Sequence, residues 1–256
     1  MNSQELIALI RAASSQELEQ LVLRYGHDPR VGVTRALAAA KRKAAQQLDE
    51  TRRLDALYAR LDAADPGTLI VGLDEVGRGA LAGPLLVAAV ALPARPRVLQ
   101  LNDSKQLSAS QREKLAAQIS ELALAIGISA VPPTEIDRIG MAAALRLAFT
   151  EALEKTDLDA DLVLIDGHPL RIDAREKAII GGDSLEASIA AASIVAKVRR
   201  DAMMSALAES YPQYELAANK GYASASHIAA LQKYGASDIH RTSFLTSILS
   251  GQERLF

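Results

Sequence analysis

The chain has 256 residues, of which 49% are hydrophobic, with no cysteine and a formal net charge of −2. The lack of cysteine excludes disulfides and thiolate metal sites and fits a reducing compartment, so we expect a cytoplasmic protein. The charge counts against a non-specific nucleic-acid binder, unless the acidic residues gather in a metal site while basic residues line a groove.

The first 64 residues are predicted to be helical throughout. Apolar residues recur there at intervals of three and four, and the run from Val33 to Leu61 is rich in Ala, Lys, Arg, Gln and Glu. The N-terminus lacks the basic and apolar regions of a signal peptide. The most apolar stretch, residues 81–92, is too short to span a bilayer, so we expect no membrane association. Asp65-Pro66-Gly67 is a turn signal, and we predict a helical extension over 1–64 and a second domain over 65–256.

After this turn, short apolar runs alternate with helical patterns. We predict strands at 68–73, 85–92, 122–131, 162–165 and 177–180, and helices at 108–120, 140–155, 184–209 and 226–234. Asp183 and Ser184 are candidate caps of the third of these helices, and Gly235 is the expected C-cap of the last. The order of the elements predicts an α/β domain with a mixed five-stranded sheet flanked by helices.

Carboxylates follow three of the apolar runs. Asp74 and Glu75 end the first strand, Asp166 ends the strand at 162–165, and Asp183 follows the strand at 177–180. Four carboxylates at one edge of a sheet would repel one another unless a hard divalent cation such as Mg²⁺ or Mn²⁺ neutralised them. A single acid at a strand end is more often a turn former or a helix cap. Spacing alone therefore leaves a metal site and ordinary turns equally tenable.

Seven motifs, in order, resemble those of the type 2 ribonucleases H, and of bacterial ribonuclease HII in particular. The first and fifth are the most specific, and the match runs from about residue 69 to 245. The motifs are Gly72-Leu73-Asp74-Glu75-Val76-Gly77-Arg78-Gly79-Ala80-Leu81-Ala82-Gly83-Pro84, Asp103-Ser104-Lys105-Gln106-Leu107-Ser108, Ile165-Asp166-Gly167, Gly182-Asp183-Ser184, Ser188 to Asp201, Lys220-Gly221-Tyr222, and His240-Arg241-Thr242-Ser243-Phe244.

The resemblance implies a ribonuclease H-like fold whose four acids, Asp74, Glu75, Asp166 and Asp183, are both metal-binding and catalytic. It implies that the backbone of Gly77, Arg78 and Gly79 approaches the sugar-phosphate, and that Tyr222 stacks where RNA meets DNA and helps to sense the 2′-hydroxyl. Lys105, Lys197 and Lys220 are candidate phosphate contacts, or else ordinary surface lysines. Asp201 lies four residues after Lys197, and we assign it to a structural ion pair.

The resemblance implies an endonuclease that cuts the RNA strand of RNA–DNA hybrids and nicks duplex DNA on the 5′ side of embedded ribonucleotides, using two Mg²⁺ or Mn²⁺ ions. A role in removing ribonucleotides from DNA follows. The alternatives are a ribonuclease HIII-like enzyme that prefers longer RNA stretches, and a non-catalytic nucleic-acid-binding module. The helical extension favours HII over HIII, and the presence of all four acids disfavours the module.

Two segments lie outside these motifs. Lys41-Arg42-Lys43 in the extension is either a nucleic-acid contact or, as we favour, a solvated helix face. The C-terminal segment 252–256 is a weak match to a tail that binds a sliding clamp, and a frayed terminus is the simpler interpretation. We expect a monomer.

Overall fold

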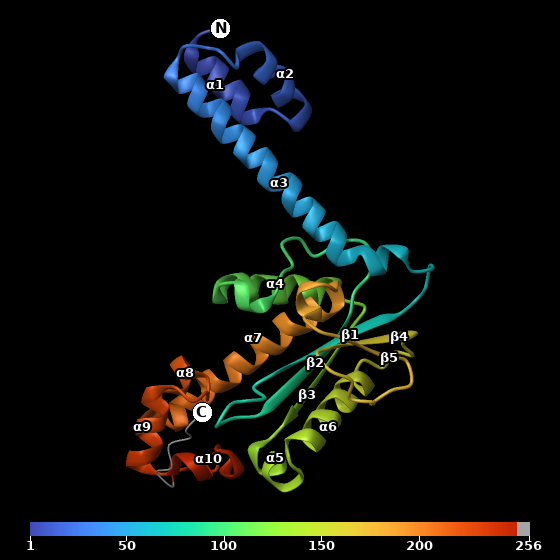
Figure 1. Ribbon diagram of the computed structural model, residues 1–256, viewed down its shortest axis with the longest axis vertical. Coiled ribbons are helices and arrows are strands. Elements are labelled where there is room, and N and C mark those ends of the chain that lie inside the picture. Colours follow the sequence, from blue (N-terminus) through green and yellow to red (C-terminus); the bar gives the residue numbers. More distant parts are fainter. Residues whose placement is uncertain (250–256) are drawn as a thin grey trace. The chain divides into compact units, whose positions relative to one another are not determined.

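The computed structural model describes residues 1–249, except for the side chains of Ser247 and Leu249 (Figure 1). The chain divides into two compact units, Met1–Ala56 and Leu57–Phe256. The division falls within helix α3 (Val31–Ala63). The predicted domain boundary at residues 64 and 65 stays a prediction.

The first unit contains α1 (Ser3–Ala12), α2 (Ser15–Tyr25) and the first part of α3. Capping boxes begin the first two helices. The Asn2 and Ser14 side chains each accept a hydrogen bond from the backbone amide of a glutamate three residues later, and that glutamate's carboxylate accepts one from the backbone amide of the capping residue. The three helices enclose an apolar core of their own, made of Leu6, Ile10, Leu18, Val33 and Leu37. This confirms the expected helical character of the N-terminal region.

The second unit is built on one five-stranded sheet in the order β3-β2-β1-β4-β5. The strands are β1 (Ile70–Val76), β2 (Leu85–Ala91), β3 (Ala125–Val131), β4 (Leu162–Asp166) and β5 (Glu176–Ile179). Strands β1, β2 and β3 pair antiparallel, whereas β4 pairs parallel with both β1 and β5. The predicted mixed five-stranded sheet is therefore confirmed.

Helices cover both faces of this sheet. Helix α6 (Met141–Glu154) packs on β1, β2 and β3, and α7 (Ala187–Ser210) packs on β1 and β2 from the opposite face (Figure 1). The main core lies between the sheet and α6, where side chains such as Leu73 and Phe149 are buried. On the other face Gly72 lets α7 approach very closely, because a Cβ there would lie 2.7 Å from Ser188 Cβ.

The remaining helices are α4 (Ala109–Leu122), α5 (Pro133–Ile139), α8 (Leu216–Asn219), α9 (Ala225–Tyr234) and α10 (Thr242–Leu249). Three 3₁₀ turns, η1 (Ser104–Gln106), η2 (Gly182–Ser184) and η3 (Pro212–Tyr214), join other elements. Across residues 1–249, no helix combines the length and apolar character needed to cross a membrane.

Several details of the predicted elements were wrong. Helices α5 and α8 were not predicted, and the strand expected at 122–131 begins only at Ala125, because Leu122 still belongs to α4. Asp183 and Ser184 do not cap the long helix; they form η2, and the N-cap position falls on Glu186, whose side chain makes no capping bond. The helix at 225–234 is not the last one, because α10 follows it. The prediction that Gly235 ends that helix was correct.

Candidate active site

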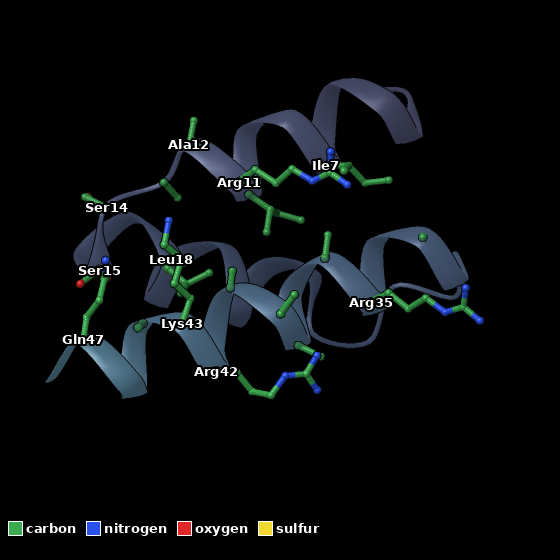
Figure 2. A pocket seen from close by; sticks show the side chains of 18 residues that line it. Ile7, Arg11, Ala12, Ser14, Ser15, Leu18, Arg35, Arg42, Lys43 and Gln47 are labelled. Carbon is green, nitrogen blue, oxygen red and sulfur yellow. The ribbon is translucent and has the colours of Figure 1, made fainter. Parts of the chain in front are cut away.

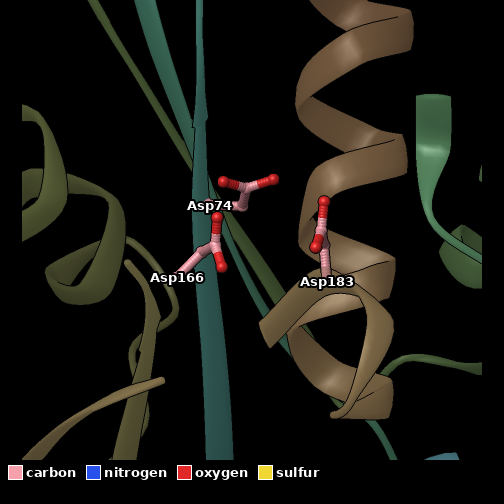
Figure 3. Close-up of side chains that lie close together, drawn as sticks. All are labelled: Asp74, Asp166 and Asp183. Atoms are coloured by element: carbon pink, nitrogen blue, oxygen red, sulfur yellow. The ribbon is translucent and has the colours of Figure 1, made fainter. Parts of the chain in front are cut away.

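The parallel pairing of β1 with β4 brings two of the predicted acids together. Leu73 pairs with Ile165, so Asp74 and Asp166 are the next residues on neighbouring strands. Asp183 reaches the same place from η2, just before α7 (Figure 3). One carboxylate oxygen from each of these three residues lies within 4.8 Å of the other two. The topology thus gathers carboxylates that are distant in the sequence.

These carboxylates are held in a poorly solvated place. Asp74 is 7% exposed and Asp183 4%. The pKa of Asp74 is raised to about 7, chiefly by burial and also by the charges of Glu75 and Asp166, against the lowering effect of a hydrogen bond from Ser193. Burial also raises the pKa of Asp166, although the amide of Gly182 donates a 2.7 Å hydrogen bond to its Oδ1. Such repulsion between buried acids is what a bound cation would relieve.

Glu75 lies beside this trio without belonging to it. Burial raises its pKa, the nearby Arg78 lowers it, and Asp166 raises it again. The Arg78 guanidinium is 3.7 Å from its Oε1. Lys105 Nζ donates a 2.7 Å hydrogen bond to Asp183 Oδ2, although the lysine side chain is 75% exposed. One lysine therefore contacts one acid of the trio.

A cavity of about 460 Å³ opens beside the acids. Nine predicted site residues line it: Asp74, Glu75, Asp166, Gly77, Arg78, Gly79, Lys105, Lys197 and Tyr222. Asp183 is absent from this lining but belongs to the carboxylate trio. Lys220 is also absent, and its Nζ donates to Ser205 Oγ at 2.7 Å. Sequence reasoning therefore found most of the lining.

Four lining residues were not singled out from the sequence: Val76, Ser104, Arg112 and Ser193. The hydroxyls of Ser104 and Ser193 are 2.8 Å apart, which links η1 to α7 directly behind Asp74. Arg112 donates hydrogen bonds to the carbonyls of Ser104 and Leu107 and holds η1 against α4. Both serines lie inside the motifs quoted above, so the motifs could have pointed to them, but in the sequence they are indistinguishable from residues that pack a helix.

Two fully buried arginines fix the loops around the cavity, and the sequence analysis did not single them out. Arg200 donates to the carbonyls of Ala82, Pro84 and Lys220 at 2.9–3.1 Å. Arg241 donates to Arg78 O at 2.9 Å and twice to Gly83 O. Burial and, to a smaller extent, the charge of Arg200 together lower the pKa of Arg241 to about 10. The two guanidiniums thus tie the Gly77–Pro84 loop to the region around Lys220.

Tyr222 and Lys197 are held by neighbours beyond the cavity. The Arg200 guanidinium carbon lies 5.3 Å from the centre of the Tyr222 ring, and the ring is 36% exposed. Such a cation–π contact orients the ring without covering all of it. Lys197 forms a 2.9 Å ion pair with Asp201, which confirms the structural pairing assigned to Asp201.

The donor set fits a hard divalent cation. It consists of carboxylate oxygens, which bind Mg²⁺ and Mn²⁺ and are poor ligands for soft metals. Burial and the charges of Glu75 and Asp166 raise the pKa of Asp74, so positive charge at this place would stabilise its ionised form. A divalent metal ion would supply that charge.

Comparisons with known proteins agree with this geometry. The family model for ribonuclease HII matches residues 71–247. The chain is 48% identical to ribonuclease HII of Ruminiclostridium cellulolyticum over 181 residues, which cover 70% of this chain and 71% of that protein. It is 42% identical to ribonuclease HII of Listeria monocytogenes over 219 residues, or 85% of this chain and 84% of the relative.

Solved structures show the same fold. The ribonuclease H2 of Pyrococcus horikoshii superposes with a TM-score of 0.62 at 26% identity, covering 72% of this chain and 98% of that one. The ribonuclease HII of Archaeoglobus fulgidus, solved in a complex with PCNA, gives 0.60 at 26% identity, covering 68% and 94%. The chain therefore belongs to the ribonuclease HII family and is a metal-dependent endonuclease that acts on the RNA strand.

Proposed function

We propose that this enzyme cuts the RNA strand of RNA–DNA hybrids and nicks duplex DNA on the 5′ side of an embedded ribonucleotide. The products are a 3′-hydroxyl and a 5′-phosphate, and the biological role is removal of ribonucleotides from DNA. The observation that carries the proposal is the trio Asp74, Asp166 and Asp183 beside a cavity lined by basic residues. That combination suits a metal-assisted attack on a phosphodiester.

In this proposal Asp74, Asp166 and Asp183 hold the metal, and Glu75 completes the set from the edge of the cavity. Two divalent ions, Mg²⁺ or Mn²⁺, would supply water activation and neutralise charge on the phosphate. Asp74 binds metal only after it loses its proton, so its raised pKa makes metal binding weaker in acid. Ser193 and the Gly182 amide hold Asp74 and Asp166 in orientation.

Substrate recognition falls to the other side of the cavity. The backbone of Gly77 to Gly79 and the Arg78 side chain contact the sugar-phosphate, and Lys105 and Lys197 pair with neighbouring phosphates. Lys220 joins them only if it leaves Ser205, so we give it the weakest role of the three lysines. Tyr222 stacks on the sugar or base at the ribonucleotide, with Arg200 behind its ring.

Recruitment by a sliding clamp is the weakest of the sequence expectations, and a frayed terminus is the simpler interpretation. The sequence basis of such recruitment, residues 252–256, lies outside the described residues. The Archaeoglobus fulgidus relative solved with PCNA makes such a partner reasonable. We retain the expectation of a monomer, which gel filtration coupled to light scattering would test.

The deciding experiment uses a labelled DNA duplex that holds one ribonucleotide, with Mg²⁺ or Mn²⁺. The wild type should nick it 5′ of the ribonucleotide, and Asp74→Asn should not. Asp159→Asn is the matched control, because that carboxylate is 98% exposed and its ion-pair partner is Arg175, which is not a site residue. Tyr222→Ala should lower the preference for the ribonucleotide far more than Tyr222→Phe, which keeps the ring.

Each other outcome has a definite meaning. If a long RNA–DNA hybrid is cut while the single-ribonucleotide duplex stays intact, the specificity is that of a ribonuclease HIII-like enzyme. If neither is cut with either metal, the four-acid assignment fails and a binding role becomes the better hypothesis.

A further inference from the structure

The N-terminal unit contains a hollow that plays no part in the proposed active site. It measures about 1150 Å³ and lies between α1, the start of α2 and α3, with all its lining residues between positions 7 and 47 (Figure 2). The helices around it already share the buried core described above. The hollow is therefore a feature of the surface of a packed unit.

Every ionisable side chain that lines this hollow is basic. The four are Arg11, Arg35, Arg42 and Lys43, and all are exposed. Within residues 1–249, none of the four forms an ion pair, whereas Arg30 and Arg53 of the same unit pair with Asp28 and Glu50. We call these four residues the basic rim. It is a local excess of positive charge without a partner in the fold.

The charge of the two units differs in sign. Residues 1–56 contain nine Lys and Arg against seven Asp and Glu, although the whole chain has a net charge of −2. The first unit thus has a net charge of +2, nine positive minus seven negative, and the four residues of the basic rim contribute to it without an ion-pair partner. A polyanion is the partner that such a surface attracts.

The spacing of the rim suits a phosphate backbone. Arg35 and Arg42 are seven residues apart on α3, two helical turns or about 10 Å along the axis, which is about the rise of three base pairs. The floor between them is made of small residues, including Gly32, Ala36 and Ala39. Short side chains let a backbone approach the helix while the long arginines reach its phosphates.

We propose that the basic rim is an auxiliary surface that binds the phosphate backbone of duplex nucleic acid independently of its base sequence. The choice of nucleic acid over an acidic protein rests on the proposed function, because an enzyme that acts on duplexes meets this polyanion in every encounter. The surface raises affinity for the duplex and leaves the chemical step unchanged.

The test compares two full-length variants that lose the same charge. One carries Arg35→Gln and Arg42→Gln in the rim; the other carries Arg24→Gln and Arg52→Gln, which are exposed positions of the same unit outside the hollow. Fluorescence anisotropy measures binding to a plain DNA duplex in EDTA across a salt series. For the rim variant, the slope of log K against log salt should be shallower by about two, and the control should keep the wild-type slope.

Equal binding of the duplex by the rim variant and the control would overturn the proposal. Poly-glutamate serves as a second polyanion, and a rim variant that binds poly-glutamate more weakly but the duplex normally would overturn it too. Because the probe contains no ribonucleotide and the buffer no metal, the result does not depend on cleavage. A wild type that binds through the rim but nicks nothing would refute the proposed function alone. Nicking by the wild type with a rim variant that binds normally would refute this inference alone.

Discussion

Gly77 and Gly79 belong to the same tripeptide, yet the structure predicts that alanine destabilises the protein at Gly77 and leaves its stability unchanged at Gly79. Gly77 has φ +87°, and a Cβ there would lie 2.7 Å from Cζ of the buried Arg200. The left-handed conformation costs alanine about 1–2 kcal/mol. Displacing Arg200 would lose at least one of its three carbonyl bonds, at about 1.5–3 kcal/mol for a charged donor. Gly77→Ala should therefore destabilise the protein by about 3–5 kcal/mol.

A loss of this size should lower Tm by roughly 10 °C, measured by circular dichroism, and should lower cleavage at a temperature where both proteins are folded. Gly79→Ala is the matched control, because nothing lies within 4 Å of its Cβ position. It should keep the wild-type Tm while raising KM if substrate backbone approaches there. An unchanged Tm in Gly77→Ala, or an equal drop in both variants, would show that the Arg200 contact does not constrain the loop.

Three further predictions concern charge. Asp74→Asn should raise the free energy of unfolding without metal by about 2–4 kcal/mol at pH 8. The pKa of Asp74 is about 7 in the folded protein against 3.8 in the unfolded chain, so the ionised acid destabilises the fold at this pH. In urea titrations with EDTA, the gain should fade as the pH drops toward 4. His240 is buried, and burial lowers its pKa to about 4. As the pH falls, the unfolded chain therefore takes up this proton first, and the free energy of unfolding should fall by about 3 kcal/mol from pH 7 to 4. The difference between wild type and His240→Asn isolates the contribution of this histidine, and identical pH profiles of the two proteins would contradict the prediction. Lys105→Gln removes the positive charge that contacts Asp183 and would compete with a metal ion for it. The Mg²⁺ concentration that gives half the thermal shift should therefore fall about two- to fivefold. A rise in that concentration would mean that the lysine positions Asp183 for the metal.

The sheet and the gathering of the acids were predictable because they depend on local patterns. Asp74 and Asp166 end apolar runs, and parallel neighbours place such ends side by side. Asp183 was found by the same reasoning, but its capping role was wrong, because the chain inserts a 3₁₀ turn before α7 begins. The position of a residue at the end of a strand can be predicted even when the start of the following helix is misplaced, whereas the exact start of a helix cannot.

Arg200 and Arg241 show what local patterns cannot give. Each is fully buried, and each satisfies its guanidinium with main-chain carbonyls that lie more than a hundred residues away, apart from Lys220 O. Nothing near either residue in the sequence signals this, since a single Arg in a helix or after a His is usually solvated. The hydrogen bond from Lys220 to Ser205 was unforeseen for a related reason, because Ser205 lies on another element.

The overall charge of −2 was a poor guide because it averages over distances that salt screens. At physiological ionic strength, charges interact over about 8 Å, so a phosphate in the cavity responds to the cavity lining and not to the whole chain. That lining combines Asp74, Glu75 and Asp166 with four basic side chains, namely Arg78, Lys105, Arg112 and Lys197. Metal bound to the acids would reverse their sign locally and leave the basic side chains facing the phosphates. An acidic protein can therefore present a positive surface to nucleic acid at the one place where the reaction occurs.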